Sequence, residues 1–279
     1  MRPLILLAAA ALTAQAQNAK QQITASIDAK FDTYRNVANQ IWGFAEVGYQ
    51  EKQSSALLQS ELTKAGFRVQ TGVAGMPTAF VAEYGSGKPV IGVLAEFDAL
   101  PGLAQNAAPE RSPIAGQIAG HACGHHLFGT ASVAAGIAVK EWLQRTGRSG
   151  TIRVYGTPAE EGGGGKIYMV RAGLFKDADV VLDWHPGSVN DASPGSSLAN
   201  KSGKFRFRGV SAHAAGAPWR GRSALDAVEA MNHMVDMLRE HVPDGTRIHY
   251  VITDGGKAPN VVPISPRRTT TFATATQRS

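Results

Sequence analysis

The sequence predicts an α/β fold: a mostly parallel sheet with helices on both faces, followed by a smaller, incomplete α+β domain. The chain has 279 residues, of which 43% are apolar, so it can bury a large core and form one or two domains. Short apolar runs that are typical of buried strands alternate with helical segments, which is the order found in parallel α/β sheets. Residues 187–202 then form a polar connector, and the pattern changes after it.

Residues 1–16 have the pattern of a secretory signal peptide. Arg2 is followed by an apolar run and then by Ala14-Gln15-Ala16, which is the order of charge, apolar core and small residues that such peptides share. The apolar run is too short to span a bilayer. We expect cleavage after Ala16 and an exported, periplasmic or secreted protein with no membrane segment. The alternative is an ordinary buried first helix.

The first domain is expected at 17–200. Its first helices are predicted at 27–42, where apolar residues recur at helical spacing, and at 52–65, which Gly66 ends in the C-terminal cap position. The remaining elements, in order, are strands 67–70, 79–84 and 90–95, an alanine-rich helix 126–142, strand 152–155, a helix near 167–171 and strand 180–184.

The second domain is expected at 201–263. Its pattern is a strand at 204–210, a helix at 224–238 and a strand at 248–253, which indicates a small α+β unit. Residues 264–279 contain arginines and a run of threonines but no acidic residue and no amphipathic period, so a disordered tail is expected there.

Charge and cysteine content exclude several classes of protein. The net charge is +6, but the charges are dispersed and form no basic stripe with interleaved aromatic residues, so a nucleic-acid partner is excluded. A single cysteine excludes an internal disulfide and a zinc finger.

That cysteine lies in the segment His121-Ala122-Cys123-Gly124-His125-His126, which holds three of the eight histidines. Cysteine and histidine are preferred ligands of transition metals, and close spacing lets two of them bind one ion. The alternative is a buried free cysteine beside incidental histidines. The cluster precedes a predicted helix, whose dipole is expected to favour the thiolate.

Three predicted strands also end in potential ligands. Strand 90–95 leads to Glu96 and Asp98, strand 152–155 to Glu160-Glu161, and strand 180–184 to His185. Ligands of open α/β sheets bind outside the carboxyl ends of strands, so these side chains and the Cys123 cluster are expected to converge on a metal.

The adjacent carboxylates Glu160 and Glu161 suit a division of labour in which one binds metal and the other acts as a base on water. Taken alone, the pair would fit an exposed acidic loop. The following Gly162–Gly165 and Lys166 do not have phosphate-loop spacing, so nucleotide binding is excluded.

These motifs resemble the co-catalytic zinc aminoacylase and carboxypeptidase family, most closely its aminobenzoyl-glutamate utilization protein B branch of amidohydrolases. The resemblance runs from about Ile27 to Pro263. The motifs that carry it are His121-Ala122-Cys123-Gly124-His125, Thr157-Pro158-Ala159-Glu160-Glu161-Gly162, Trp184-His185-Pro186, Ala95-Glu96-Phe97-Asp98-Ala99-Leu100-Pro101, Ser211-Ala212-His213-Ala214-Ala215 and Asn260-Val261-Val262-Pro263.

The resemblance implies a hydrolase with two divalent metal ions, zinc or manganese, that cleaves the amide bond of an N-acyl amino acid such as an aminobenzoyl-glutamate-like amide or a dipeptide. Cys123 would bridge the metals, His125 and His185 would complete one site, and Glu161 would serve the other. Glu160 would be the general base.

Residues around these ligands also take implied roles. Asp98 would orient a ligand imidazole, and Asn260 would hold the substrate or the oxyanion. His213, in a lid domain that forms a homodimer, would reach the partner subunit's site and stabilise the oxyanion. His121 and His126 would be structural or would lie behind the ligands.

The family continues past Pro263 with further strands and a last histidine ligand, whereas no histidine follows His249 here. We therefore expect the resemblance to end at Pro263, as out-of-frame coding or a truncated gene product would cause. One alternative function is an inactive remnant that keeps the fold and partial metal binding. Another is a thiol hydrolase with Cys123 as nucleophile and His125 as base.

Overall fold

The computed structural model describes residues 17–192, 199, 201–264 and 269–271. The chain divides into two compact units between Asn190 and Asp191, earlier than the boundary expected at residue 200. The expected signal peptide at 1–16 and most of the expected tail lie outside the described residues. Among the described residues, no helix combines the length and apolar character needed to cross a bilayer.

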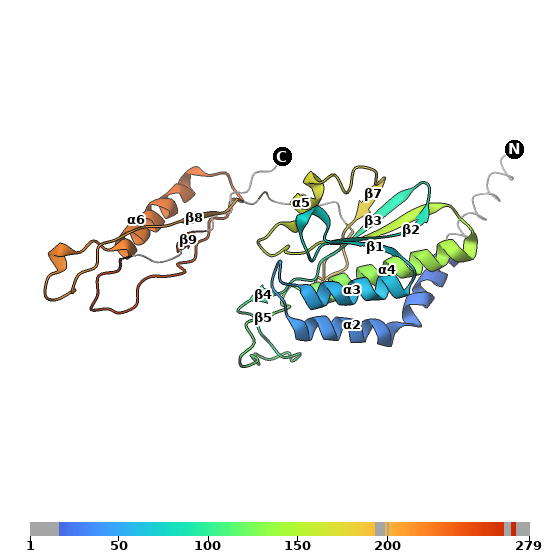
Figure 1. Cartoon of the computed structure of the whole chain (residues 1–279), viewed down its shortest axis with the longest axis horizontal. Coiled ribbons are helices and arrows are strands. Elements are labelled where there is room, and N and C mark those ends of the chain that lie inside the picture. Colours follow the sequence, from blue (N-terminus) through green and yellow to red (C-terminus); the bar gives the residue numbers. More distant parts are fainter. Residues whose placement is uncertain (1–16, 193–198, 200, 265–268, 272–279) are drawn as a thin grey trace. The chain divides into compact units, whose positions relative to one another are not determined.

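The first unit is built on a five-stranded sheet in the order β1-β2-β6-β3-β7 (Figure 1). Its strands are β1 (Arg68–Thr71), β2 (Phe80–Ser86), β6 (Gly150–Gly156), β3 (Val90–Ala95) and β7 (Val180–Leu182). β3 pairs in parallel with both β6 and β7, whereas β2 runs antiparallel to β1 and β6. The predicted α/β class is confirmed, and the antiparallel β1–β2 edge makes the sheet mixed. A short 3-10 turn, η1 (Val73–Gly75), lies between β1 and β2, and β4 (Leu100–Pro101) pairs with β5 (Ala119–Gly120).

Helices lie on both faces of the sheet (Figure 1). One face carries α2 (Phe31–Phe44), α3 (Lys52–Lys64) and α4 (His125–Thr146), and the other carries α5 (Gly165–Arg171). Residues 17–28 are also helical, and a turn at residues 29–30 separates them from α2, so the single helix expected at 27–42 is two helices. As predicted, Gly66 terminates α3: it follows the C-cap residue Ala65 and has a left-handed φ of 88°.

Alternating side chains of the central strands build two cores. Ile152 and Val154 of β6 face α4, while Tyr155 faces Met169 of α5. α4 packs closely on the sheet because a Cβ on Gly136 would lie 2.5 Å from the side chain of Val154.

β7 is less well covered than its neighbours. It is an edge strand of the described sheet, and its three side chains are 48%, 38% and 54% exposed. Apolar side chains therefore line this edge.

The second unit holds η2 (Pro218–Arg220), α6 (Ala224–Met237), η3 (Leu238–His241) and the strand pair β8 (Gly203–Phe205) with β9 (Thr269–Thr271). Two expectations are wrong here. Residues 248–253 form no strand, and β9 lies within the expected disordered tail. Threonine favours extended backbone, and β9 pairs with β8, whereas residues 248–253 contain a single isolated bridge residue at Val251.

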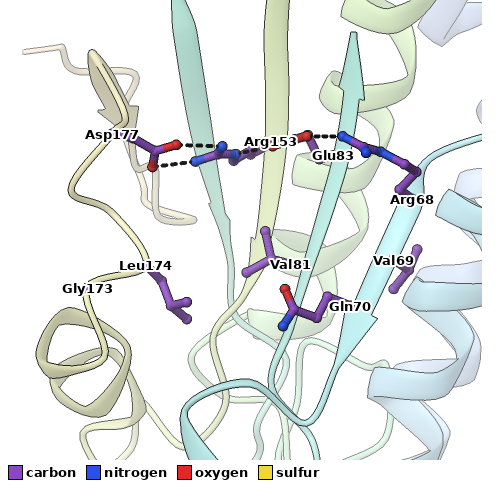
Figure 2. Close-up of a pocket in the computed structure, with 9 residues that line it drawn as sticks. All are labelled: Arg68, Val69, Gln70, Val81, Glu83, Arg153, Gly173, Leu174 and Asp177. Atoms are coloured by element: carbon purple, nitrogen blue, oxygen red, sulfur yellow. Dashed lines mark hydrogen bonds and ion pairs between the residues drawn. The ribbon is translucent and has the colours of Figure 1, made fainter. Parts of the chain in front are cut away.

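A cleft of about 480 Å³ on the sheet face is crossed by a row of charges (Figure 2). Arg153 of β6 binds Asp177 through two hydrogen bonds of 2.7 Å and Glu83 of β2 through one of 2.6 Å. Arg68 of β1 also pairs with Glu83. The four charges satisfy one another, so the row links strands and supplies no evident ligand group.

Replacing Arg153 with alanine should therefore destabilise the first unit by about 2 kcal/mol, because the half-buried Glu83 loses a charged partner. Urea unfolding measures the loss. The matched control is Arg35→Ala, whose ion pair with Asp32 is exposed and should change stability by less than about 0.5 kcal/mol. Equal effects of the two substitutions would contradict a structural role for the row.

Candidate metal centre

The predicted ligands of the first unit gather where β3, β6 and β7 end and α4 begins. Glu96 and Asp98 follow β3, Glu160 and Glu161 follow β6, and His185 follows β7. Cys123 lies two residues before the start of α4, and His125 is the first residue of that helix. The topology thus brings together side chains that are far apart in the sequence.

Cys123, His125 and His185 form one group whose ligand atoms all lie within 4.8 Å of one another. Cys123 Sγ is 3.3 Å from His185 Nε2. His185 Nδ1 donates to the carbonyl of Pro186 at 2.8 Å, so Nε2 carries the lone pair in the neutral ring. The His185 Nε2 lone pair therefore lies beside the Cys123 sulfur, where both atoms could bind the same metal ion.

His125 is fully buried and is held by Asp98. Its Nδ1 donates to Asp98 Oδ1 at 3.0 Å and to the Asp98 carbonyl at 3.1 Å, which aims Nε2 into the site. Burial works to lower the pKa of His125, but the Asp98 and Glu96 carboxylates outweigh it and raise the pKa to about 10. Without metal, the His125 ring is therefore protonated on both nitrogens and positively charged at neutral pH.

A second group, Glu96, His125 and Glu160, shares His125 with the first. Sequence reasoning noted Glu96 at the strand end but gave it no role. Glu96 is 4% exposed, and its other oxygen pairs with Lys166 of α5. Burial raises the pKa of Glu96, yet the contacts with His125 and Lys166 outweigh it and lower the pKa overall. The i, i+2 spacing of Glu96 and Asp98 could have predicted that Glu96 faces the site, since in extended backbone it puts both side chains on the same side as each other.

The donor set fits a metal. Glu96 Oε2 lies 3.0 Å from His125 Nε2, with which it forms an ion pair while the ring is protonated, and Glu161 Oε1 is buried without a hydrogen-bond partner among the described residues. Carboxylates buried this close together need a compensating positive charge, which either the extra proton on His125 or a bound metal ion can supply. Thiol, imidazole and carboxylate together suit zinc or manganese.

The expectation that the helix dipole favours the Cys123 thiolate is wrong for the metal-free chain. Burial, followed by the neighbouring carboxylates of Glu161, Glu160 and Glu96, raises the pKa of this thiol to about 12. Cys123 precedes Gly124, the N-cap of α4, so it lies just outside the helix while three negative charges surround it. In the metal-free chain the Cys123 thiol is therefore protonated at neutral pH.

The loop carrying Glu160 and Glu161 is fixed by a hydrogen bond from its backbone to the Asp98 carboxylate. The N–H of Glu161 donates to Asp98 Oδ2 at 2.9 Å, and the preceding Ala159 has a left-handed φ of 55°. The Glu160 side chain is 44% exposed and its Oε2 lies 4.0 Å from His125 Nε2. Burial, together with the charge of Glu96, raises the pKa of Glu160. Such a carboxylate suits proton transfer.

His121 and His126 are packed beside the site. His126 lies edge-on to the ring of Trp42 at 4.9 Å, and His121 Nε2 is 3.0 Å from the carbonyl of Ile41. Burial lowers the pKa of each to about 4, so both rings are neutral at pH 7.

His213 and Asn260 belong to the second unit, and the structure does not place them relative to Cys123. They lie close to each other, because Ala214 N donates to the Asn260 carbonyl at 3.0 Å. His213 Nδ1 accepts from Ala215 N and Gly216 N, at 3.2 and 2.9 Å, so the neutral ring carries its proton on Nε2. The exposed ring can therefore donate a hydrogen bond.

Curated proteins resemble this chain over most of its length. It is 48% identical over 240 residues to the B subunit of p-aminobenzoyl-glutamate hydrolase from Escherichia coli, a match that covers 85% of this chain and 50% of that protein. It is 32% identical over 257 residues to the Xaa-Arg dipeptidase of Mus musculus, covering 88% of this chain and 56% of that protein. The chain thus spans about half the length of these relatives.

Solved structures share the fold. A putative aminohydrolase from Staphylococcus aureus matches 92% of this chain and 67% of its own, with a TM-score of 0.62 and 19% identity. A dinuclear metal-binding peptidase of the M20 family from Bacillus subtilis matches 90% of this chain and 66% of its own, with a TM-score of 0.54 and 20% identity.

A family model described as Peptidase family M20/M25/M40 matches residues 92–278. The expectation that the resemblance ends at Pro263 is therefore wrong, because the match continues almost to the last residue. The matched segment covers more than half of the chain and includes every candidate ligand described above. The chain belongs to peptidase family M20/M25/M40.

Proposed function

We propose that this chain is a metal-dependent amidohydrolase that cleaves the amide bond of an N-acyl amino acid, with an aminobenzoyl-glutamate-like amide as the leading substrate. The observation that carries the proposal is the Cys123, His125 and His185 ligand group, with the Glu160 carboxylate 4.0 Å from His125. The 48% identity to the Escherichia coli p-aminobenzoyl-glutamate hydrolase supports the substrate class.

The site residues suit two divalent ions, zinc or manganese. Cys123, His125 and His185 would hold one ion. Cys123 and Glu161 would hold the other, with Glu96 as a further carboxylate in reach of His125. When bound, such ions supply a Lewis acid that polarises the amide carbonyl and activates water. Asp98 keeps Nε2 of His125 turned toward the site.

Glu160 is the proposed general base. Its carboxylate takes a proton from the attacking water and later passes it to the leaving amine. The raised pKa of Glu160 lies closer to neutral pH, so the carboxylate can both accept a proton and return it. The side chain is partly exposed, which leaves room for water.

His213 and Asn260 are proposed to bind the substrate and the developing oxyanion. The Nε2–H of His213 is the donor that this role requires. We also propose that the second unit forms the homodimer, so that His213 serves the partner subunit's site. The signal-like residues 1–16 support export to the periplasm or beyond the cell.

The zinc- or manganese-loaded protein should hydrolyse p-aminobenzoyl-glutamate, and Glu160→Gln should lower the rate at least about 100-fold, because an amide cannot take the proton of water. Chromatography of the released amine measures the rate, and elemental analysis measures bound metal. Glu229→Gln is the matched control, since it makes the same change at an exposed position of α6.

Glu160→Gln should leave the metal content unchanged, and loss of metal would identify Glu160 as a ligand instead of the base. Metal binding without turnover would favour the inactive-remnant alternative. Activity that resists chelators and disappears when Cys123 is alkylated would favour the thiol hydrolase.

Zinc binding at pH 8 should release close to two protons, because His125 and Cys123, with pKa values of about 10 and about 12, are both protonated in the metal-free chain. The apparent affinity should rise with pH for the same reason. Calorimetry in two buffers of different ionisation enthalpy counts the protons.

Cys123→Ser should bind zinc more weakly and release about one proton fewer, because a serine hydroxyl does not ionise there. Unchanged proton release in Cys123→Ser would exclude the thiol as a ligand.

A further inference from the structure

Glu51 is a fully buried carboxylate that sequence reasoning did not single out. It occupies the N-cap position of α3, yet its side chain does not cap the helix. Glu46 does so instead, because its carboxylate accepts from Gln53 N at 3.0 Å and from Ser54 N at 2.9 Å. The Glu51 side chain therefore has a different task from the usual one at this position.

The Glu51 carboxylate binds the loop that carries the general base. Its Oε1 accepts a hydrogen bond from Ala159 N at 2.7 Å, and its Oε2 accepts one from the Thr78 hydroxyl at 3.1 Å. Ala159 is fully buried and directly precedes Glu160. A residue 108 positions earlier in the chain thus fixes the start of the Glu160-Glu161 segment.

Ala159 needs to be held because its conformation is unfavourable. Its φ of 55° lies in the left-handed region, which is unfavourable for a residue with a Cβ. The Ala159 side chain packs directly against two glycines, and a larger residue at either would collide with it. A Cβ on Gly48 would lie 2.9 Å from the Ala159 Cβ, and a Cβ on Gly163 would lie 2.6 Å from it. Strain of this kind persists where neighbouring groups enforce it.

We propose that Glu51 is a positioning residue that holds Ala159 in its left-handed conformation and thereby fixes Glu160 and Glu161 at the metal centre. Asp98 holds the other side of the same segment through Glu161 N, so two buried carboxylates take the N–H groups on either side of Glu160. The backbone of Glu160 is fixed in this way while its side chain stays 44% exposed. What the segment does there rests on the proposed function.

A carboxylate is a costly choice for merely filling space. Burial raises the pKa of Glu51, while the N–H groups it accepts from work in the opposite direction. An apolar side chain of similar volume would avoid that desolvation. It would also leave Ala159 N without a partner in the interior, so the charge is explained by the N–H that it binds.

The test is the zinc affinity of the metal-free chain, measured by competition with a chromophoric chelator. Glu51→Ala should weaken zinc binding roughly 10- to 100-fold, as loss of groups behind metal ligands does. Glu51→Gln should weaken it less, because the amide oxygen can still accept from Ala159 N. The matched control is Thr151→Val, which removes one hydrogen bond to a carbonyl at the opposite end of β6 and should leave the affinity unchanged.

The distinguishing variant is Glu51→Ala combined with Ala159→Gly. Glycine adopts positive φ without the penalty, so the double variant should recover about fivefold of the lost affinity. A residue that only stabilised the fold would give no such recovery. Hydrogen exchange of the Ala159 amide in the unmodified chain should show strong protection.

Wild-type zinc affinity in folded Glu51→Ala, absence of recovery in the double variant, or rapid exchange of the Ala159 amide would each overturn the proposal. If Glu51→Ala does not fold, Glu51→Leu with and without Ala159→Gly carries the same comparison, because leucine fills the space but cannot accept from Ala159 N. None of these measurements uses a substrate. A chain that binds zinc as expected but cleaves no amide would overturn the proposed function and leave the role of Glu51 standing.

Discussion

The site depends on one buried carboxylate, Asp98, that joins two segments far apart in the sequence. One oxygen holds the ring of His125 at the start of α4, and the other holds the backbone of Glu161 after β6. Burial opposes ionisation of Asp98, but the His125 and Glu161 contacts outweigh it and lower the pKa. The side chain thus keeps the charge that both contacts require. Phe97, between Glu96 and Asp98, points the other way and stacks on Phe80 in the core, which anchors this end of β3.

Charge explains much of the remaining geometry. Carboxylates from three strand ends approach one another here, and within the described part of the chain Lys166 is the cationic side chain that pairs with Glu96. The metal-free site compensates further by keeping a proton on His125 and on Cys123. Divalent ions would replace those protons. The repulsion between the carboxylates, which destabilises the site without metal, therefore favours metal binding.

The sequence predicts elements well where local pattern decides them. β3 occupies the predicted residues, α3 ends just before Gly66, and α4 and β6 extend only a few residues beyond their predicted ranges. Long-range contacts are not encoded locally, so the roles of Glu96, Lys166 and Glu51 emerge only when distant segments meet. The thiolate prediction for Cys123 considered the helix alone and missed the carboxylates brought by other strands. Residues 248–253 have strand-like composition, yet only Val251 takes part in a bridge, so composition alone does not decide whether a strand forms.

The exposed apolar edge at β7 bears on how any assembly of this chain is to be interpreted. Within the described residues β7 has a strand neighbour on one side only, and an edge with exposed Val180, Val181 and Leu182 is a template for pairing with another chain. Self-association in dilute buffer could therefore arise from sheet continuation at this edge as well as from the second unit. Sheet continuation would bring His185, three residues beyond β7, near the interface, whereas pairing through the second unit would leave that edge open.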